Sequence, residues 1–123
     1  MKAIIFSSLL CLSTLVHANT VCNTEPASFE NLACLNKNYQ QANKEVSIYF
    51  KKLKNKLDKE GKDLLNNGQL TWLEQRNESC IKNEADELFF NINCAINMSI
   101  ERSRFIQERL HECLNTTCQN NKL

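Results

Sequence analysis

Residues 69–80 read Gln-Leu-Thr-Trp-Leu-Glu-Gln-Arg-Asn-Glu-Ser-Cys, and no other stretch of the sequence says as much about the fold. Trp72, Arg76 and Cys80 are spaced four residues apart, which places all three on one side of a helix. A Trp and an Arg on a face that carries a cystine indicate a packed seam between helices, where the indole N–H and the guanidinium need hydrogen-bond partners. In the alternative, the two side chains form an exposed anchor for a partner, because both residue types are common at binding hot spots. We favour the packed seam.

Apolar side chains recur at steps of three and four in the regions that flank this stretch. The first set covers one helical face and comprises Leu35, Tyr39, Ala42, Val46, Tyr49, Leu53 and Leu57. We expect this helix to begin near Phe29, with Ser28 as its cap, and to stop at Gly61. A second helix is expected from about residue 62 to 82, with a turn or a kink at residues 66–68. A last helix is expected from about residue 94 to 114.

The remaining segments have weaker patterns. Residues 83–93 combine acids with Leu88-Phe89-Phe90 and fit either a helix or a loop. The polar tail at residues 115–123 is expected to be loose. Because the chain has only 2 Gly and 1 Pro, a turn-rich β fold is disfavoured. The predicted class is all-α: a small antiparallel bundle of three to four helices stapled by disulfides.

Residues 1–18 have the layout of a secretory signal peptide. Lys2 precedes an apolar run over residues 3–16, and Val16-His17-Ala18 places small residues before the expected cleavage site. The apolar run is too short for a comfortable membrane span, so we expect no span once it is removed. The mature chain then begins at Asn19 and forms a single helical domain over residues 19–123, which is secreted or periplasmic.

Cysteine is abundant, and an even number of cysteines in a small exported domain is typical of a disulfide framework. Of the 7 cysteines, Cys11 is removed with the signal peptide, which leaves Cys22, Cys34, Cys80, Cys94, Cys113 and Cys118. Sequence alone does not choose among the possible pairings, although Cys113 and Cys118 are close enough to close a small loop and would leave the other four to tie the helices together. No metal site is expected, because the chain has no Cys-x-x-Cys and His111 is the only histidine after cleavage.

The charge balance and the residue types disfavour several classes of function. Removal of Lys2 from the 15 Lys and Arg leaves 14, which equals the 14 Asp and Glu and gives a formal net charge of zero. Nucleic acid is therefore not an expected partner. A nucleophile–His–acid site would have to use His111, and the residues near it lack the required pattern. We expect neither catalysis nor a cofactor, and infer that the protein binds another protein.

The motifs of this chain resemble those of the LprI-like lysozyme inhibitor family of exported bacterial proteins. That family carries an early pair of cysteines, a Tyr-containing helix, a Gln-x-x-Trp-x-x-x-Arg-Asp-x-x-Cys segment and a further Cys followed by Thr-x-x-Arg. The matching residues here are Cys22, Cys34, Tyr39, Gln69, Trp72, Arg76, Cys80, Cys94 and Arg102, with Ser99 in place of the Thr. Asn77 replaces the acid after Arg76, residues 83–90 replace a Gly-Ser-rich stretch, and Cys113 and Cys118 are an added pair.

The resemblance implies an exported inhibitor of lysozyme-type peptidoglycan hydrolases that acts by steric and electrostatic blockade. The segment expected to contact such an enzyme offers acids for a basic surface and apolar anchors beside them: Glu84, Asp86, Glu87, Phe89 and Phe90. In the competing interpretation, Leu88, Phe89 and Phe90 close the core. Two other functions fit the same scaffold. One is a periplasmic immunity or adaptor protein against another toxin or envelope enzyme, and the other is a secreted eukaryotic effector with glycans on Asn77, Asn97 or Asn115.

Overall fold

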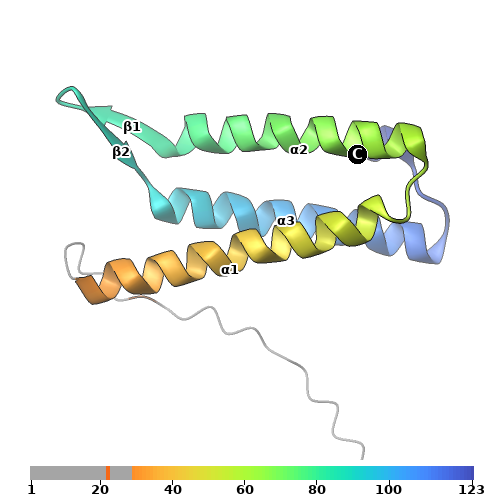
Figure 1. The fold of residues 1–123 in the computed structure, drawn as a ribbon, viewed down its shortest axis with the longest axis horizontal. Coiled ribbons are helices and arrows are strands. Elements are labelled where there is room, and N and C mark those ends of the chain that lie inside the picture. Colours follow the sequence, from red (N-terminus) through yellow and green to blue (C-terminus); the bar gives the residue numbers. More distant parts are fainter. Residues whose placement is uncertain (1–21, 23–28) are drawn as a thin grey trace, which may run out of the picture.

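The computed structural model describes Cys22 and residues 29–123. This part of the chain contains three α-helices, one antiparallel hairpin and a short 3-10 helix. In chain order the elements are α1 (Phe29–Lys54), α2 (Lys59–Cys80), β1 (Ile81–Glu84), β2 (Glu87–Phe90), α3 (Ile92–Asn115) and η1 (Asn120–Lys122) (Figure 1). The signal peptide expected at residues 1–18 and the cap expected at Ser28 lie outside the described residues. The mostly helical class is confirmed, and the small sheet is an addition to it.

The three helices form a bundle in which α1 runs in one direction, α2 returns and α3 again runs with α1 (Figure 1). α1 and α3 pack most closely, so the tightest pair of helices is parallel. The predicted antiparallel arrangement therefore holds only for helices that follow each other in the sequence. The core lies between the helices and is formed by Ala42, Val46, Leu53, Leu57, Leu65, Ile96 and Ile106.

The junction between α1 and α2 differs from the prediction. α1 ends at Lys54, and the Asp58 side chain accepts a hydrogen bond of 2.7 Å from the Gly61 backbone N–H and so caps α2. Gly61 lies in the first turn of α2 and does not end α1, because a strong N-cap residue stands three positions before it. A Cβ atom at Gly61 would come 2.5 Å from Asn120 Oδ1, so the tail approaches the first turn of α2 closely at this position. No turn interrupts α2 at residues 66–68.

A β-hairpin replaces the helix or loop that was expected over residues 83–93. The strands pair in register from Ile81 with Phe90 to Glu84 with Glu87, and two residues form the turn between them. Ile and Phe side chains favour strands, and a two-residue turn is the tightest connection between antiparallel strands. The short hairpin thus connects the end of α2 directly to the start of α3 (Figure 1).

Six cysteines of the described part form three disulfides, and each disulfide joins one cysteine to the next cysteine along the chain. The pairs are Cys22–Cys34, Cys80–Cys94 and Cys113–Cys118. The small loop closed by the last pair is confirmed. Only Cys80–Cys94 joins two helices, whereas Cys22 is bridged to α1 from outside any helix, which corrects the expectation that four cysteines tie the helices together.

The C-terminal tail is docked on the bundle, in contrast to the loose segment expected from its polar sequence. The Cys113–Cys118 bridge turns the chain back, and the Asn120 side chain then donates a hydrogen bond of 3.1 Å to Asp58 Oδ1 at the start of α2. Leu123 packs against the core. Because covalent, polar and apolar contacts all hold the tail, it closes one end of the bundle.

Candidate functional site

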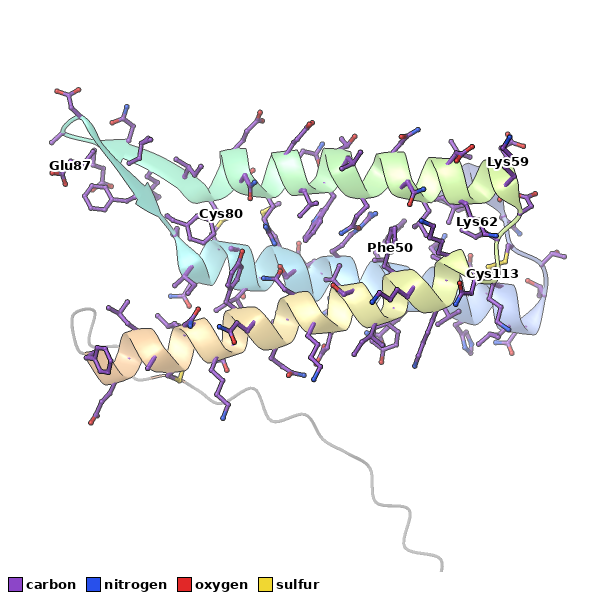
Figure 2. The ribbon with its side chains drawn as sticks, in the orientation of Figure 1. Phe50, Lys59, Lys62, Cys80, Glu87 and Cys113 are labelled. Atoms are coloured by element: carbon purple, nitrogen blue, oxygen red, sulfur yellow. A yellow bond between two sulfur atoms is a disulfide. The ribbon has the colours of Figure 1, made fainter. Side chains whose placement is uncertain are left out.

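The hairpin projects from the end of the bundle at which α2 is joined to α3, with Glu87 near its tip and Cys80 at its base (Figure 2). All residues of β1 and β2 are exposed. Leu88 is 75% exposed, and Phe89 and Phe90 are both exposed as well. The interpretation in which these three side chains close the core is therefore wrong. Large apolar side chains of the hairpin therefore meet solvent directly.

The two faces of the hairpin have different chemistry. Residues that are directly opposite in the register share a face, and successive residues alternate between faces. One face, called here the apolar face, consists of Ile81, Asn83, Leu88 and Phe90. The other, called here the acidic face, consists of Lys82, Glu84, Glu87 and Phe89. Of the segment that sequence predicted for partner binding, Glu84, Glu87 and Phe89 thus fall on one face and Phe90 on the other.

The tip of the hairpin contains two features that oppose its own stability. Glu84 and Glu87 are directly opposite each other, and like charges in such a pair repel. Ala85 (φ 51°) and Asp86 (φ 65°) both have left-handed backbone conformations, which aspartate tolerates but which cost alanine about 1 kcal/mol or more. Glycine, asparagine and aspartate normally occupy such turns, so Ala85 is the unusual residue here. Local costs of this kind, at an exposed tip, are typical of segments that serve a partner.

The base of the hairpin is held firmly, in contrast to its tip. Cys80 is fully buried at the end of α2 and is bridged to Cys94 in the first turn of α3. The Asn91 backbone N–H donates a hydrogen bond of 2.8 Å to the Cys80 carbonyl, which continues the strand pairing. The Phe90 ring meets the Tyr39 ring of α1 edge-on, with 6.0 Å between the centroids. The hairpin is therefore fixed to all three helices.

The seam predicted from residues 69–80 is present and continues beyond that stretch. The Arg76 guanidinium lies 5.1 Å from the centroid of Trp72 and 5.7 Å from that of Tyr39, and Arg76 is 8% exposed. The Trp72 ring also lies 5.9 Å from the Arg102 guanidinium. The alternation continues with two further residues of α3, and the whole set, called here the Arg–aromatic ladder, is Tyr39, Arg76, Trp72, Arg102, Phe105 and Arg109. Stacking of arginine on aromatic rings favours the desolvated guanidinium.

Polar side chains accept hydrogen bonds from two arginines of the ladder. Arg76 Nη1 donates a hydrogen bond of 2.9 Å to Asn43 Oδ1, and Ser99 Oγ donates one of 3.1 Å to the same oxygen. Arg102 Nε donates a bond of 3.0 Å to Gln69 Oε1. Burial lowers the pKa of Arg102 below its usual range. All of these acceptors are neutral, so the two guanidinium groups are held by amide and hydroxyl oxygens and by rings.

The four motif residues predicted from sequence, Gln69, Trp72, Arg76 and Arg102, are thus brought together between α2 and α3. Arg76 is too deeply buried to act as an exposed anchor, and the seam leads directly to Cys80 at the base of the hairpin. Sequence reasoning missed Asn43 and did not link Ser99 or Phe105 to this seam. Asn43 and Ser99 are 56 residues apart, and no local spacing links them.

Other kinds of site are not formed by the described residues. No group of three His, Cys, Asp or Glu side chains among them is arranged to hold a metal ion. No helix in this part of the chain is both long and apolar enough to cross a membrane. An open hollow of about 450 Å³ lies beside α1 and α3, away from the hairpin, and its lining includes Tyr49, Arg104 and His111. His111 is exposed there and its Nε2 lies 2.8 Å from Asn115 Nδ2.

Comparison with known proteins identifies the family of this chain. No curated protein and no solved structure shows a significant match. A family model described as "Lysozyme inhibitor LprI" matches residues 22–112. The match starts at the first disulfide and includes the Arg–aromatic ladder and the hairpin, whereas the Cys113–Cys118 bridge and the docked tail lie beyond it. Because the match covers most of the sequence and carries the motif predicted from residues 69–80, the chain belongs to the LprI lysozyme inhibitor family.

Proposed function

We propose that this protein is an exported inhibitor of lysozyme-type peptidoglycan hydrolases, and that its hairpin binds the enzyme and blocks the substrate cleft. Membership of an inhibitor family supports the general activity. The observation that carries the choice of surface is the exposed hairpin, which presents acids and large apolar side chains on a rigid base. The three disulfides fit an oxidising compartment outside the cytoplasm, in agreement with the signal peptide proposed at residues 1–18.

The dimensions of the hairpin suit a cleft that accepts a polysaccharide. Two paired strands lie about 5 Å apart, and four residues of strand extend for about 13 Å. The ribbon is therefore thin enough to enter such a cleft and long enough to fill several sugar positions. An inhibitor of this kind needs no chemistry of its own, because excluding the substrate is sufficient.

The charges at the tip suit the rim of the cleft better than its floor. Glycoside hydrolases of this type carry catalytic carboxylates in the cleft, which would repel further acids. Glu84, Asp86 and Glu87 would instead pair with basic side chains around the opening, and would increase the rate of association. Leu88 and Phe89 would provide the apolar contacts. Because the base of the hairpin is fixed, little conformational entropy is lost on binding.

The test is a lysis assay with the mature chain, its disulfides intact, added to chicken-type and goose-type lysozymes. We expect stoichiometric inhibition of at least one enzyme, and weaker inhibition at high salt because exposed charges are screened. The double variant Glu84→Gln/Glu87→Gln should weaken binding by about tenfold at low salt, since each lost charge pair at the rim contributes modestly. The variant Glu101→Gln, which removes an exposed acid on α3, is the matched control. Full enzyme rate together with no binding by calorimetry would contradict the proposal.

A further inference from the structure

Each strand of the hairpin has an outer edge, because the sheet in the described part of the chain consists of β1 and β2 alone. The Asn91 backbone N–H bonds to the Cys80 carbonyl, which makes these two residues a hydrogen-bonded pair at the base of the hairpin. Hydrogen-bonded and non-hydrogen-bonded pairs alternate along an antiparallel ladder. The residues whose backbone N–H and C=O groups point outward are therefore those of the non-hydrogen-bonded pairs: Ile81 and Asn83 on β1, and Phe90 and Leu88 on β2.

The two edges carry different side chains. Between its two outward-facing residues β1 has Lys82, whereas β2 has Phe89 at the position directly opposite. Charged side chains, and lysine in particular, protect an exposed edge from pairing with another strand, and an apolar edge lacks this protection. Leu88 is 75% exposed and Phe89 is 48% exposed. The edge of β2 is therefore both accessible and unprotected.

We propose that β2 pairs with β2 of a second copy of this chain, antiparallel about a two-fold axis, so that the two hairpins form one four-stranded sheet. The register that uses both outward-facing residues places Leu88 opposite Phe90 of the second copy, and Phe90 opposite Leu88 of that copy. Each chain then donates two backbone hydrogen bonds across the axis and accepts two. This inference does not rest on the proposed function.

The side chains in this register complement their own copies. Leu88 and Phe90 belong to the apolar face of each hairpin, so the two apolar faces join into one. On the other face Phe89 lies opposite Phe89 of the second copy, and cross-strand aromatic pairs stabilise sheets. Glu87 lies opposite Asn91 of the second copy, so this pairing places no carboxylate of β2 directly opposite another. The sequence of β2 therefore selects a second copy of itself as the occupant of its edge.

The corresponding symmetric register on β1 is unfavourable. Ile81 would lie opposite Asn83 of the second copy, and Lys82 would lie opposite Lys82 of that copy, where like charges repel. A hairpin of two strands is marginally stable, whereas three or more strands with an apolar face are stable in water. Pairing through β2 extends the sheet to four strands without that repulsion.

The experiment measures the monomer–dimer equilibrium of the mature chain by sedimentation equilibrium. Because the interface is small, we expect a weak dimer that forms at micromolar to millimolar concentration. Leu88→Pro should raise the dissociation constant by about tenfold or more, since proline removes an outward N–H and leaves the ladder of the hairpin in place. Asn83→Pro is the matched control, because it removes the outward N–H directly opposite, on the β1 edge, and should leave the dimer unchanged.

Disulfide trapping tests the register without a proline in the strand. Residues directly opposite in a non-hydrogen-bonded pair have Cα atoms about 4.5 Å apart, within the range that a disulfide spans. Phe89→Cys should therefore crosslink two chains rapidly. Leu70→Cys is the matched control, since Leu70 is 60% exposed on α2 and would crosslink only through random collisions. Non-reducing electrophoresis and peptide mapping identify the new bond and check that the native disulfides are intact.

The outcomes separate this inference from the proposed function. A chain that stays monomeric at every concentration at which it is soluble overturns the inference, as do equal effects of the two proline variants or equal crosslinking of the two cysteine variants. If the chain is monomeric and Leu88→Pro abolishes binding to chicken-type lysozyme, the β2 edge belongs to the hydrolase and only the proposed function stands. A dimer with the expected variant effects that inhibits no lysozyme supports the inference and contradicts the proposed function.

Discussion

At one end of the bundle the chain between α2 and α3 runs outward as a hairpin, and at the other end the chain after α3 turns back onto the start of α2 (Figures 1 and 2). Both segments are short, and a disulfide between consecutive cysteines of the chain closes each of them. The tail uses its bridge to bring Asn120 and Leu123 onto the bundle. The hairpin uses its bridge to hold a base from which exposed side chains extend. A disulfide therefore docks the tail at one end of the bundle, and a disulfide holds the base of an exposed hairpin at the other.

The residues matched by the family model include the hairpin at one end of the bundle and exclude the tail at the other. The match includes the ladder that supports the hairpin, but ends at residue 112, just before the bridge that fixes the tail. The hairpin and the ladder thus lie within the matched residues, and the Cys113–Cys118 bridge and the tail lie outside them. We therefore expect changes at the hairpin end to affect binding, and changes at the tail end to affect stability alone.

Removal of each disulfide in turn is expected to have the largest effect, and it tests whether the two ends of the bundle have different roles. Cys80→Ser/Cys94→Ser opens a loop of 14 residues and Cys113→Ser/Cys118→Ser one of 5 residues. The chain-entropy model then predicts losses of about 3 and about 2 kcal/mol in the free energy of unfolding. Only the first variant should also lose binding, because it releases the base of the hairpin. Urea unfolding and calorimetric titration measure both quantities, and equal losses of binding in the two variants would refute the division of roles.

A smaller change sharpens the role of the tip. Ala85→Asn should stabilise the turn by about 0.5 kcal/mol, because asparagine tolerates the left-handed backbone better than alanine does. Binding to the hydrolase should be retained or slightly stronger, since a stiffer hairpin loses less entropy. Hydrogen exchange of the strand amides reports the stiffening. A large loss of affinity would instead show that the tip must change its conformation in the complex.

The helices and the seam could be predicted from the sequence because their signals are local. The spacing of apolar residues marks the buried face of α1, and the spacing of Trp72, Arg76 and Cys80 marks the seam. Pairings over long separations left no such signal: Asn43 meets Ser99 only because α1 and α3 lie side by side in parallel. The hairpin was missed because its strands have only 4 residues each and depend on the adjacent bridge.

Competition between two local signals explains the misplaced end of α1. Gly61 was expected to stop that helix, but the Asp58 side chain captures the Gly61 N–H and starts α2 instead. The tail reinforces this choice, since Asn120 fits against Gly61 and bonds to Asp58. The N-cap at Asp58 therefore placed Gly61 inside the first turn of α2, although glycine often ends a helix.

The last expected effect concerns pH at the tail end. Hydrogen bonds from the Gly61 backbone N–H, and then from the Asn120 side chain, lower the pKa of Asp58 below its ordinary range. A carboxyl whose pKa is lower in the folded state stabilises the fold above its unfolded pKa, and this contribution is lost as pH falls through the folded value. The thermal stability of the unmodified chain, measured as its unfolding midpoint, should therefore decrease below about pH 4.

Asp58→Asn tests this account, because asparagine keeps an oxygen for the cap but carries no titratable charge. The acid-induced decrease in the unfolding midpoint should be smaller in this variant. Asn120→Ala should also reduce the decrease, since it removes the second donor and leaves the Gly61 bond in place. Lysozyme binding at neutral pH should be the same for all three proteins, because the hairpin lies at the opposite end. Parallel acid profiles for the three proteins would show that the docked tail does not depend on the Asp58 charge.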